Sequence, residues 1–380
     1  MKKTYRAAII GLGRMGSTFD DEIARGGAFF LPYAHAPSYV ESPLVELVAA
    51  ADLHPEQREI FGERWGLSQE HLYSDYNEML AQEQIDIVSV CTTLRHRCAI
   101  IEEIVQSGVK AIWSEKPLAA TLAEADTIVR VCDATGVAIA VNCQRRWHPL
   151  FNEVKQMIVA GELGQVLQIN LQGTFGLSNN GSHILDIIRY LAGGEVEWVF
   201  GEMASDEMAM SDEEPMGNGY LAFDNGVRSF VRSMKSGAAM MNFEIIGEQG
   251  IVRTFDQGMS WEMSRIADSD PDSHSVRPPS LRFPRPLSVR YPFPLPNRIQ
   301  GIGLTIVEDL VASIETGSSP RCSAKDAAIA LEIAIAMRES HRRGGVKVTL
   351  PLEDRSLRML SNDMRGDALP RRVRDQGGKR

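Results

Sequence analysis

The chain begins with a strand, a tight turn and a helix start, and this combination limits its fold more than any other feature. Residues 5–10 form a short apolar run that ends in G-L-G-R-M-G, the pattern G-x-G-x-x-G. Such a turn lets backbone N–H groups at a helix start approach a pyrophosphate. The glycines alone are a weak signal, but their position directly after a strand favours dinucleotide binding over a purely structural turn. The expected contact residues are Gly11, Gly13, Arg14, Met15 and Gly16.

Strand and helix signals then alternate as far as residue 145. Nearly unbroken apolar runs lie at 45–51, 85–91, 109–113 and 137–141, and helical patterns separate them. One of these helices starts with T-L-A-E at 121–124, which is a capping box. Buried runs that alternate with helices predict an α/β fold with a doubly wound parallel sheet.

Polar residues follow several of these strands, at the edge where open α/β sheets bind ligands. Asp52 ends the second strand, where a carboxylate accepts hydrogen bonds from ribose hydroxyls and repels a 2′-phosphate, so NAD is favoured over NADP. It lies 36 residues after Gly16 instead of about 20. We therefore expect an insertion at 19–36, either a loop at the ligand end of the sheet or a surface elaboration without ligand contact. Further expected cofactor contacts at this edge are Thr92, Thr93, Arg97, Glu115 and Lys116.

The pattern changes after Pro149. Several later runs alternate with period two, which is typical of antiparallel sheet, and a long helix is expected over 324–342. Residues 268–297 are rich in Asp, Ser and Pro and predict a long loop rather than a central strand. We predict a dinucleotide-binding domain over 1–147, an α+β domain with a large, mostly antiparallel open sheet over 148–355, and a polar, solvated tail over 356–380.

Composition excludes other classes of function. Forty Lys and Arg against 50 Asp and Glu give a net charge of -10, which argues against nucleic acid as a partner. No apolar stretch approaches the 18–20 or so residues of a membrane span, and the run behind Met1 is too short for a signal peptide, so a cytoplasmic protein is expected. The five cysteines show no C-x-x-C spacing, so we expect reduced, mostly buried thiols and no metal site.

The order of several motifs resembles one enzyme family. These motifs are the glycine loop, E-K-P at 115–117, Q-R-R-W-H-P at 144–149, G-E-L-G-Q-V at 161–166 and G-S-H-I-L-D-I at 181–187. Over about residues 4–351 the chain is similar to the glucose–fructose oxidoreductase, inositol dehydrogenase and MocA-like (Gfo/Idh/MocA) family. The resemblance implies a Rossmann domain that carries NAD(P) and a second domain whose open sheet forms a homodimer or homotetramer interface. It also implies hydride transfer at a secondary alcohol of a sugar, cyclitol or sugar derivative.

The same resemblance places Lys116, the lysine of E-K-P, beside nicotinamide and substrate. His183 matches the family's helix histidine and can take the hydroxyl proton as the hydride leaves. On that helix Asn179, His183 and Asp186 share one face, which we predict to meet substrate together with Arg145. The alternative for the helix residues is a solvated polar face, and the alternative for Lys116 is a surface lysine paired with Glu115. Of the two adjacent arginines, Arg145 and Arg146, one is expected in the pocket and the other in a structural ion pair.

Three departures from the family pattern bear on the chemistry. Asn179 stands where many members carry an aspartate, so a carboxylate is missing beside His183. The loop T-T-L-R-H-R at 92–97 lacks the usual proline and puts Arg97 in the histidine register, where an arginine suits an anionic group or faces water. The 19–36 insertion is expected at the pocket mouth.

Two other functions are compatible with the sequence. One is a lyase or glycosidase that keeps its NAD bound through a closed redox cycle. Such an enzyme oxidises one carbon of a sugar, eliminates or hydrolyses a group at the neighbouring carbon, and then reduces the oxidised carbon again. The other is a non-catalytic regulator that senses dinucleotide or sugar. The presence of both Lys116 and His183 argues against the regulator.

Overall fold

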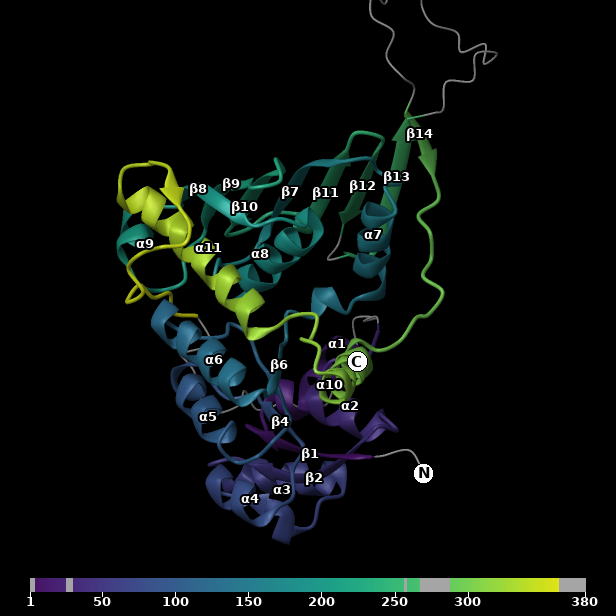
Figure 1. The fold of residues 1–380 in the computed structure, drawn as a ribbon, viewed down its shortest axis with the longest axis vertical. Helices are drawn as coiled ribbons and strands as arrows, with labels where there is room; N and C mark the ends of the chain where they lie inside the picture. The colour runs from purple at the N-terminus through teal and green to yellow at the C-terminus, as the bar shows by residue number, and fades with distance from the viewer. Residues whose placement is uncertain (1–3, 25–29, 256–257, 267–287, 362–380) are drawn as a thin grey trace, which may run out of the picture.

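The alternating first part of the chain forms a six-stranded parallel sheet in the computed structural model (Figure 1), which describes residues 4–24, 30–255, 258–266 and 288–361. The strand order is β3-β2-β1-β4-β5-β6, so the order reverses beside β1, at the edge where the glycine loop lies. The strands are β1 (Tyr5–Ile10), β2 (Val45–Ala51), β3 (Leu72–Tyr73), β4 (Ile87–Val90), β5 (Ala111–Ser114) and β6 (Ala138–Val141).

The strands of this sheet are mostly buried because helices pack against the sheet. Ile9, Val88 and Ile112 have no exposed surface. The predicted capping box at the start of α6 has both of its hydrogen bonds. The Thr121 hydroxyl accepts from the Glu124 N–H, and the Glu124 carboxylate accepts from the Thr121 N–H. The helices are α1 (Phe19–Ala24), α2 (His35–Glu41), α3 (Pro55–Trp65), α4 (Tyr76–Gln82), α5 (Arg97–Ile104) and α6 (Leu122–Thr135), with a π-helical turn at Arg14–Thr18 and 3₁₀ turns at Gln69–His71, Leu94–His96 and Gln144–Arg146.

The second part of the chain forms a nine-stranded, mostly antiparallel sheet, as predicted; among its described strands, only β7 and β10 pair in parallel. Its order is β14-β13-β12-β11-β7-β10-β9-β8-β15. The strands are β7 (Val166–Thr174), β8 (Val196–Met203), β9 (Gly217–Phe223), β10 (Arg228–Met234), β11 (Met240–Gly247), β12 (Gly250–Phe255), β13 (Ser260–Ile266), β14 (Ser288–Tyr291) and β15 (Val348–Thr349).

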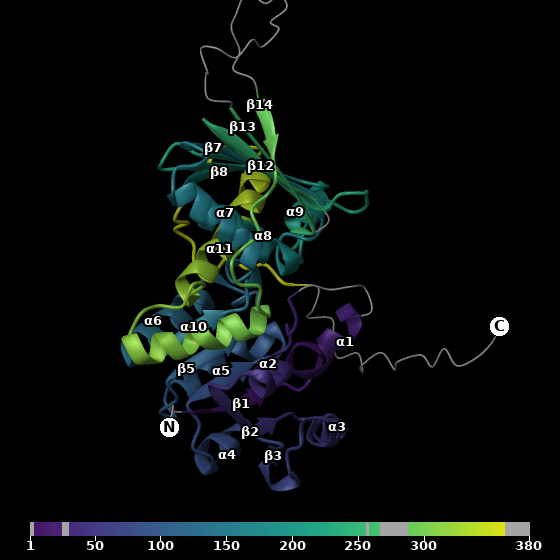
Figure 2. The ribbon, with the colours of Figure 1, turned by 90° about the vertical axis from the view of Figure 1, so that its right-hand side faces the viewer.

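Helices lie on one face of this sheet, between it and the first domain (Figures 1 and 2). They are α7 (Pro149–Val159), α8 (Asn179–Ala192), α9 (Asp206–Met210) and α11 (Ala324–Arg342). The predicted helix at 324–342 is therefore confirmed, and its nearly complete burial between β8, α8 and α6 explains its apolar residues all round. The opposite face exposes apolar side chains that include Leu167, Phe200 and Phe230.

Four expectations need correction. The loop prediction over 268–297 is wrong at Ser288–Tyr291, which forms the edge strand β14; 268–287 lie outside the described residues. The 19–36 insertion is not only loop, since it holds α1 and the start of α2. Helix α10 (Ile302–Thr316), assigned to the second domain, packs against α2, β5 and β6 of the first (Figure 2).

The fourth correction concerns the expected polar tail. Residues 356–361 are ordered against the first domain, where the Leu122 N–H donates to the Leu357 carbonyl and the Met359 N–H to the Ala120 carbonyl. Met359 is fully buried. The rest of the tail, 362–380, lies outside the described residues. Within the described part of the chain, no helix is long and apolar enough to cross a lipid bilayer.

Candidate active site

A cavity of about 700 Å³ lies between the two domains, at the carboxyl ends of β4, β5 and β6. The first domain contributes the glycine-loop turn, the segment after β4 and the E-K-P segment after β5. The second domain contributes the start of α8 and the start of β11. The lining residues are Arg14, Met15, Phe19, Cys91, Thr92, Thr93, Leu94, Arg97, Glu115, Lys116, Pro117, Asn142, Gln144, Arg145, Thr174, Asn179, Asn180, His183, Met240, Met241 and Ser361.

Lys116 enters the cavity directly after β5. The Lys116–Pro117 peptide bond is cis. The Lys116 ammonium donates a hydrogen bond to Oδ1 of Asn179, on the first turn of α8. The structure therefore brings together the E-K-P lysine and the helix residue that stands where many family members carry an aspartate.

Glu115 lies just behind Lys116 and is almost fully buried. Its Oε1 accepts from Nδ2 of Asn142 at 2.6 Å and from Nε2 of His35 at 3.1 Å. Burial alone would raise the pKa of Glu115, but the hydrogen bond from His35, the charge of Lys116 and the Asn142 amide outweigh it and lower that pKa. Glu115 is thus an ionised carboxylate next to Lys116.

His35 reaches Glu115 from α2, within the insertion. Because a carboxylate cannot donate, Nε2 carries the proton of a neutral His35, and Nδ1 accepts from the Ser89 hydroxyl at 2.8 Å. The Tyr39 hydroxyl in turn donates to Ser89 at 2.7 Å. Burial lowers the pKa of His35 despite Glu115, and its ring stacks on Trp113 with centroids 3.7 Å apart. Sequence reasoning missed His35, since a lone histidine in an aromatic-rich insertion carries no periodic signal.

His183 lies on α8, lines the cavity and is 6% exposed. Its Nδ1 has no hydrogen-bond partner among the described residues. Burial, followed by the positive charges of Lys116 and Arg145, lowers the pKa of His183 well below its ordinary value. The imidazole is therefore neutral at pH 7, the state in which it can accept a proton.

The two adjacent arginines divide as expected. Arg146 forms two hydrogen bonds with the Asp186 carboxylate, at 2.7 and 2.8 Å, away from the cavity. Burial opposes the charge of Arg146, but Asp186 and Asp326 outweigh it and raise its pKa. Asp186 is fully buried in this pair and does not line the cavity, so its predicted contact with substrate finds no support in its position. Arg145 does line the cavity.

The glycine turn fits a dinucleotide. Gly11 has φ +91°, and a Cβ on Gly16 would collide with the Gly11 backbone, so both positions need glycine. A Cβ on Gly13 would meet nothing within 4 Å, so that backbone is open to a ligand. Asp52 ends β2 beside the turn, where its carboxylate accepts from the Leu12 N–H at 2.8 Å.

The remaining predicted cofactor residues differ in their surroundings. Arg14 lines the cavity next to Met15, and its guanidinium pairs with Glu22 at 2.6 Å. Thr92 and Thr93 also line the cavity. Arg97 does not face water: it is buried and donates to the carbonyl oxygens of Thr92, at 2.6 Å, and of Pro117. It thereby joins the segment after β4 to the E-K-P segment.

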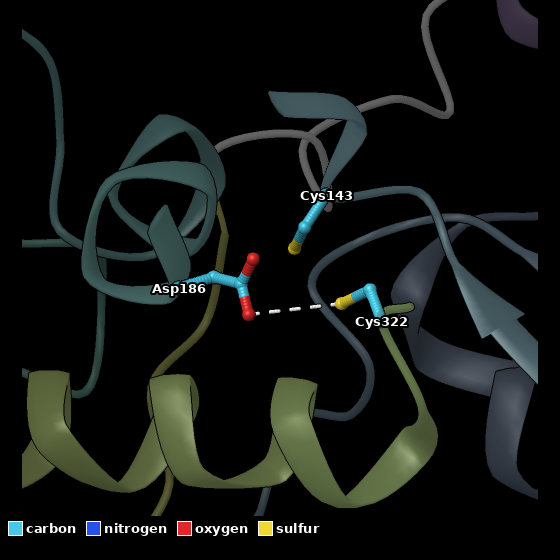
Figure 3. Close-up of side chains that lie close together, drawn as sticks. All are labelled: Cys143, Asp186 and Cys322. Carbon is cyan, nitrogen blue, oxygen red and sulfur yellow. Dashed lines mark hydrogen bonds between the residues drawn. The ribbon is translucent and has the colours of Figure 1, made fainter. Parts of the chain in front are cut away.

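A separate buried cluster lies behind α8. Cys143, Asp186 and Cys322 place a ligand atom each within 4.8 Å of one another, and Figure 3 shows the Asp186 carboxylate facing both sulfur atoms. Cation binding there is disfavoured, because Arg146 already occupies both carboxylate oxygens and burial raises the pKa of the Cys322 thiol, whereas metals bind thiolates. All five cysteines are free.

Sequence reasoning missed several lining residues. They are Phe19, Cys91, Leu94, Pro117, Asn142, Gln144, Thr174, Asn180, Met240, Met241 and Ser361. Gln144 is the first residue of the motif at 144–149, Asn142 lies just before it and Asn180 adjoins Asn179, so the recognised motifs could have indicated these residues. Nothing in the sequence indicated Ser361, which reaches the cavity from the segment expected to be a solvated tail.

Comparison with known proteins gives matches to both domains. Residues 5–143 match the model of an oxidoreductase family with an NAD-binding Rossmann fold, and residues 155–350 match that family's C-terminal alpha/beta domain. The chain is 26% identical to D-apiose dehydrogenase of Paraburkholderia graminis, over 90% of this chain and 89% of that protein. It is 25% identical to scyllo-inositol 2-dehydrogenase (NAD⁺) of Bacillus subtilis, over 90% and 96%.

Among solved structures, the chain resembles an inositol dehydrogenase homolog from Azotobacter vinelandii complexed with NADH and myo-inositol. The TM-score is 0.70 at 18% identity, over 91% of this chain and 98% of that one, which shows a shared fold. The second-domain match alone spans more than half of the chain. Together with the glycine turn and the E-K-P segment at one cavity, these matches show that the chain belongs to the Gfo/Idh/MocA family of NAD(P)-dependent oxidoreductases.

Proposed function

We propose that the protein is an NAD-dependent dehydrogenase or reductase that acts on a secondary alcohol or ketone of a sugar, cyclitol or sugar derivative. One observation carries the proposal: Lys116 and a neutral His183 line the same cavity, from opposite domains, at the ligand edge of a dinucleotide-binding sheet. The curated relatives named for action on apiose and inositol support the substrate class.

The glycine turn, Asp52 and the segments after β4 and β5 would hold the dinucleotide, whose nicotinamide accepts or supplies the hydride when bound. His183 would take the hydroxyl proton during oxidation, since the Nδ1 of its neutral imidazole has no partner in the described part of the chain. Lys116 would stabilise the negative charge that develops on the substrate oxygen. Glu115 would place a negative charge next to Lys116, and the Asn179 amide oxygen accepts the hydrogen bond of the Lys116 ammonium.

NAD is the favoured cofactor. The Asp52 carboxylate lies at the end of β2, where it would accept from ribose hydroxyls and repel a 2′-phosphate. The nearby Arg58 guanidinium donates to the main-chain carbonyls of Asp52 and Leu53, at 2.7 and 3.2 Å.

The exposed aromatic face of the nine-stranded sheet supports a homodimer or homotetramer, which sedimentation velocity would measure.

The test is turnover by Lys116→Met and His183→Asn variants, with Lys347→Met and His71→Asn as matched controls outside the cavity. Removal of either proposed group should lower kcat/KM by about 10²- to 10⁴-fold. The controls should stay within about twofold of the original enzyme, and NADH fluorescence titration checks that the variants still bind cofactor. Wild-type turnover by both cavity variants would sink the proposal, and turnover without net NADH release would indicate a closed redox cycle instead.

A further inference from the structure

Arg145 is a buried positive charge that no carboxylate of the described residues pairs with. It is 9% exposed, lies in the 3₁₀ turn after β6 and lines the cavity. Its Nη2 contacts the Met241 sulfur at 2.7 Å, and its Nη1 has no hydrogen-bond partner among the described residues. Burial of a guanidinium is costly unless an anion and hydrogen bonds compensate it.

The neighbouring charges do not compensate Arg145. Asp186 is engaged by both nitrogens of the Arg146 fork. Tyr33 also faces Arg145, but burial raises the pKa of its phenol to about 12, so it is uncharged at pH 7. The adjacent Arg146 has two carboxylate partners, whereas none of the described residues supplies one to Arg145, and a bound anion would supply it.

The whole cavity wall has an excess of positive charge. Among the described residues that line it, the cations are Arg14, Arg97, Lys116 and Arg145, and the one carboxylate is Glu115. Glu22 compensates Arg14, and Glu115 is held by His35 and Asn142. The pyrophosphate of a bound dinucleotide would be balanced by positive charge near the glycine turn. The positive charges of Lys116 and Arg145, at the substrate end of the cavity, would remain without a counter-charge.

Asn179 sharpens this imbalance. Its neutral amide accepts the hydrogen bond from Lys116, so this chain lacks a carboxylate on the first turn of α8. The positive charges of Lys116 and Arg145 both lower the pKa of the nearby His183. An anion bound beside them would offset that effect and strengthen His183 as a proton acceptor.

We infer that the substrate carries a carboxylate, which Arg145 binds, and that the protein acts on a sugar acid in preference to a neutral sugar. This inference rests on the proposed function and deepens it. A planar guanidinium suits a carboxylate because two parallel N–H groups can meet its two oxygens. The reacting hydroxyl remains the one at Lys116 and His183; the carboxylate positions it and supplies the negative charge that the cavity lacks.

The experiment compares kcat/KM with NAD for D-gluconate, D-galactonate and D-glucuronate against D-glucose, D-galactose and myo-inositol, with D-glucose 6-phosphate as a separate arm. At least one acid should exceed every neutral compound by tenfold or more. Arg145→Met should lower kcat/KM for the acid by at least tenfold and that for neutral compounds by less than threefold. If that variant does not fold, competition on the original enzyme replaces it: glutarate should inhibit and glutaramide should not.

The outcomes separate the two proposals. Equal or better turnover of neutral compounds would overturn the carboxylate inference and leave the proposed function standing. A preference for D-glucose 6-phosphate over the acids would overturn the carboxylate in favour of a phosphate. Absence of turnover in all arms, with NAD and with NADP, would overturn the proposed function and the inference with it.

Discussion

Replacement of Arg146 by methionine should be among the most destabilising single substitutions in this chain. The substitution removes both hydrogen bonds from Arg146 to Asp186 and leaves the fully buried Asp186 carboxylate without this cation. Breaking such a buried pair from one side costs about 3–5 kcal/mol of unfolding free energy. At roughly 2–4 °C per kcal/mol for a domain of 150–250 residues, the Tm should fall by about 10 °C.

Differential scanning calorimetry and urea denaturation measure this effect, with Arg298→Met as the control. Arg298 pairs with Glu308 at 2.9 Å, but it is exposed, and exposed pairs contribute about 0–1 kcal/mol. The double variant Arg146→Met with Asp186→Leu removes both charges and should recover at least half of the lost stability. A loss in Arg146→Met no larger than the control, or a double variant as unstable as the single one, would refute the argument from the buried charge.

Two further predictions concern pH and cofactor choice. Burial, followed by the charge of Arg145, lowers the pKa of His148 to about 3. The His148 imidazole therefore takes up a proton at higher pH in the unfolded chain than in the folded one, and the free energy of unfolding falls as the pH drops from 6.5 towards 3. The expected loss is about 2 kcal/mol at pH 5. The His148→Asn variant keeps a side chain that can accept from the Leu150 N–H but cannot titrate. Between pH 7 and pH 5 its urea midpoint should fall less than that of the original protein. An equal fall in both proteins would contradict the lowered pKa of His148. Asp52→Ser should lower the NAD-to-NADP ratio of kcat/KM at least tenfold, because the repelling carboxylate is gone and Arg58 is nearby; an unchanged ratio would show that Asp52 does not select the cofactor.

The parts of the fold that were predictable are those with local physical signatures. The glycine pattern, the capping box at Thr121 and the apolar helix over 324–342 each reflect contacts within a few residues or burial of the element itself. The apolar periodicity of α10 is equally regular, but periodicity reports burial and does not name the partner. Its packing on the first domain and the pairing of β14 at a sheet edge therefore required the structure.

The site divides in the same way. Lys116, His183 and Arg145 were indicated by motifs, and all three line the cavity. Asp186 shares the polar side of α8 in sequence, yet it turns to Arg146, because a helix face shows which residues are neighbours and not what they contact. His35 lies 80 residues from Glu115, and Ser361 lies still further along the chain, so only the tertiary fold reveals that both belong to the site or support it.

The distance between Lys116 and Asn179 depends on more than the chain crossing at 147–149. The Ile302 N–H donates to the Phe30 carbonyl, the Val141 N–H donates to the Cys322 carbonyl, and residues 355–359 bond to the start of α6. Each contact joins the later half of the sequence to a different segment of the first domain. The later half of the chain is therefore tied to the first domain at several points besides the crossing at 147–149. The geometry that would bring substrate hydroxyl, lysine and histidine together is therefore a property of these long-range contacts, which is why motifs could name the residues of the site but not their arrangement.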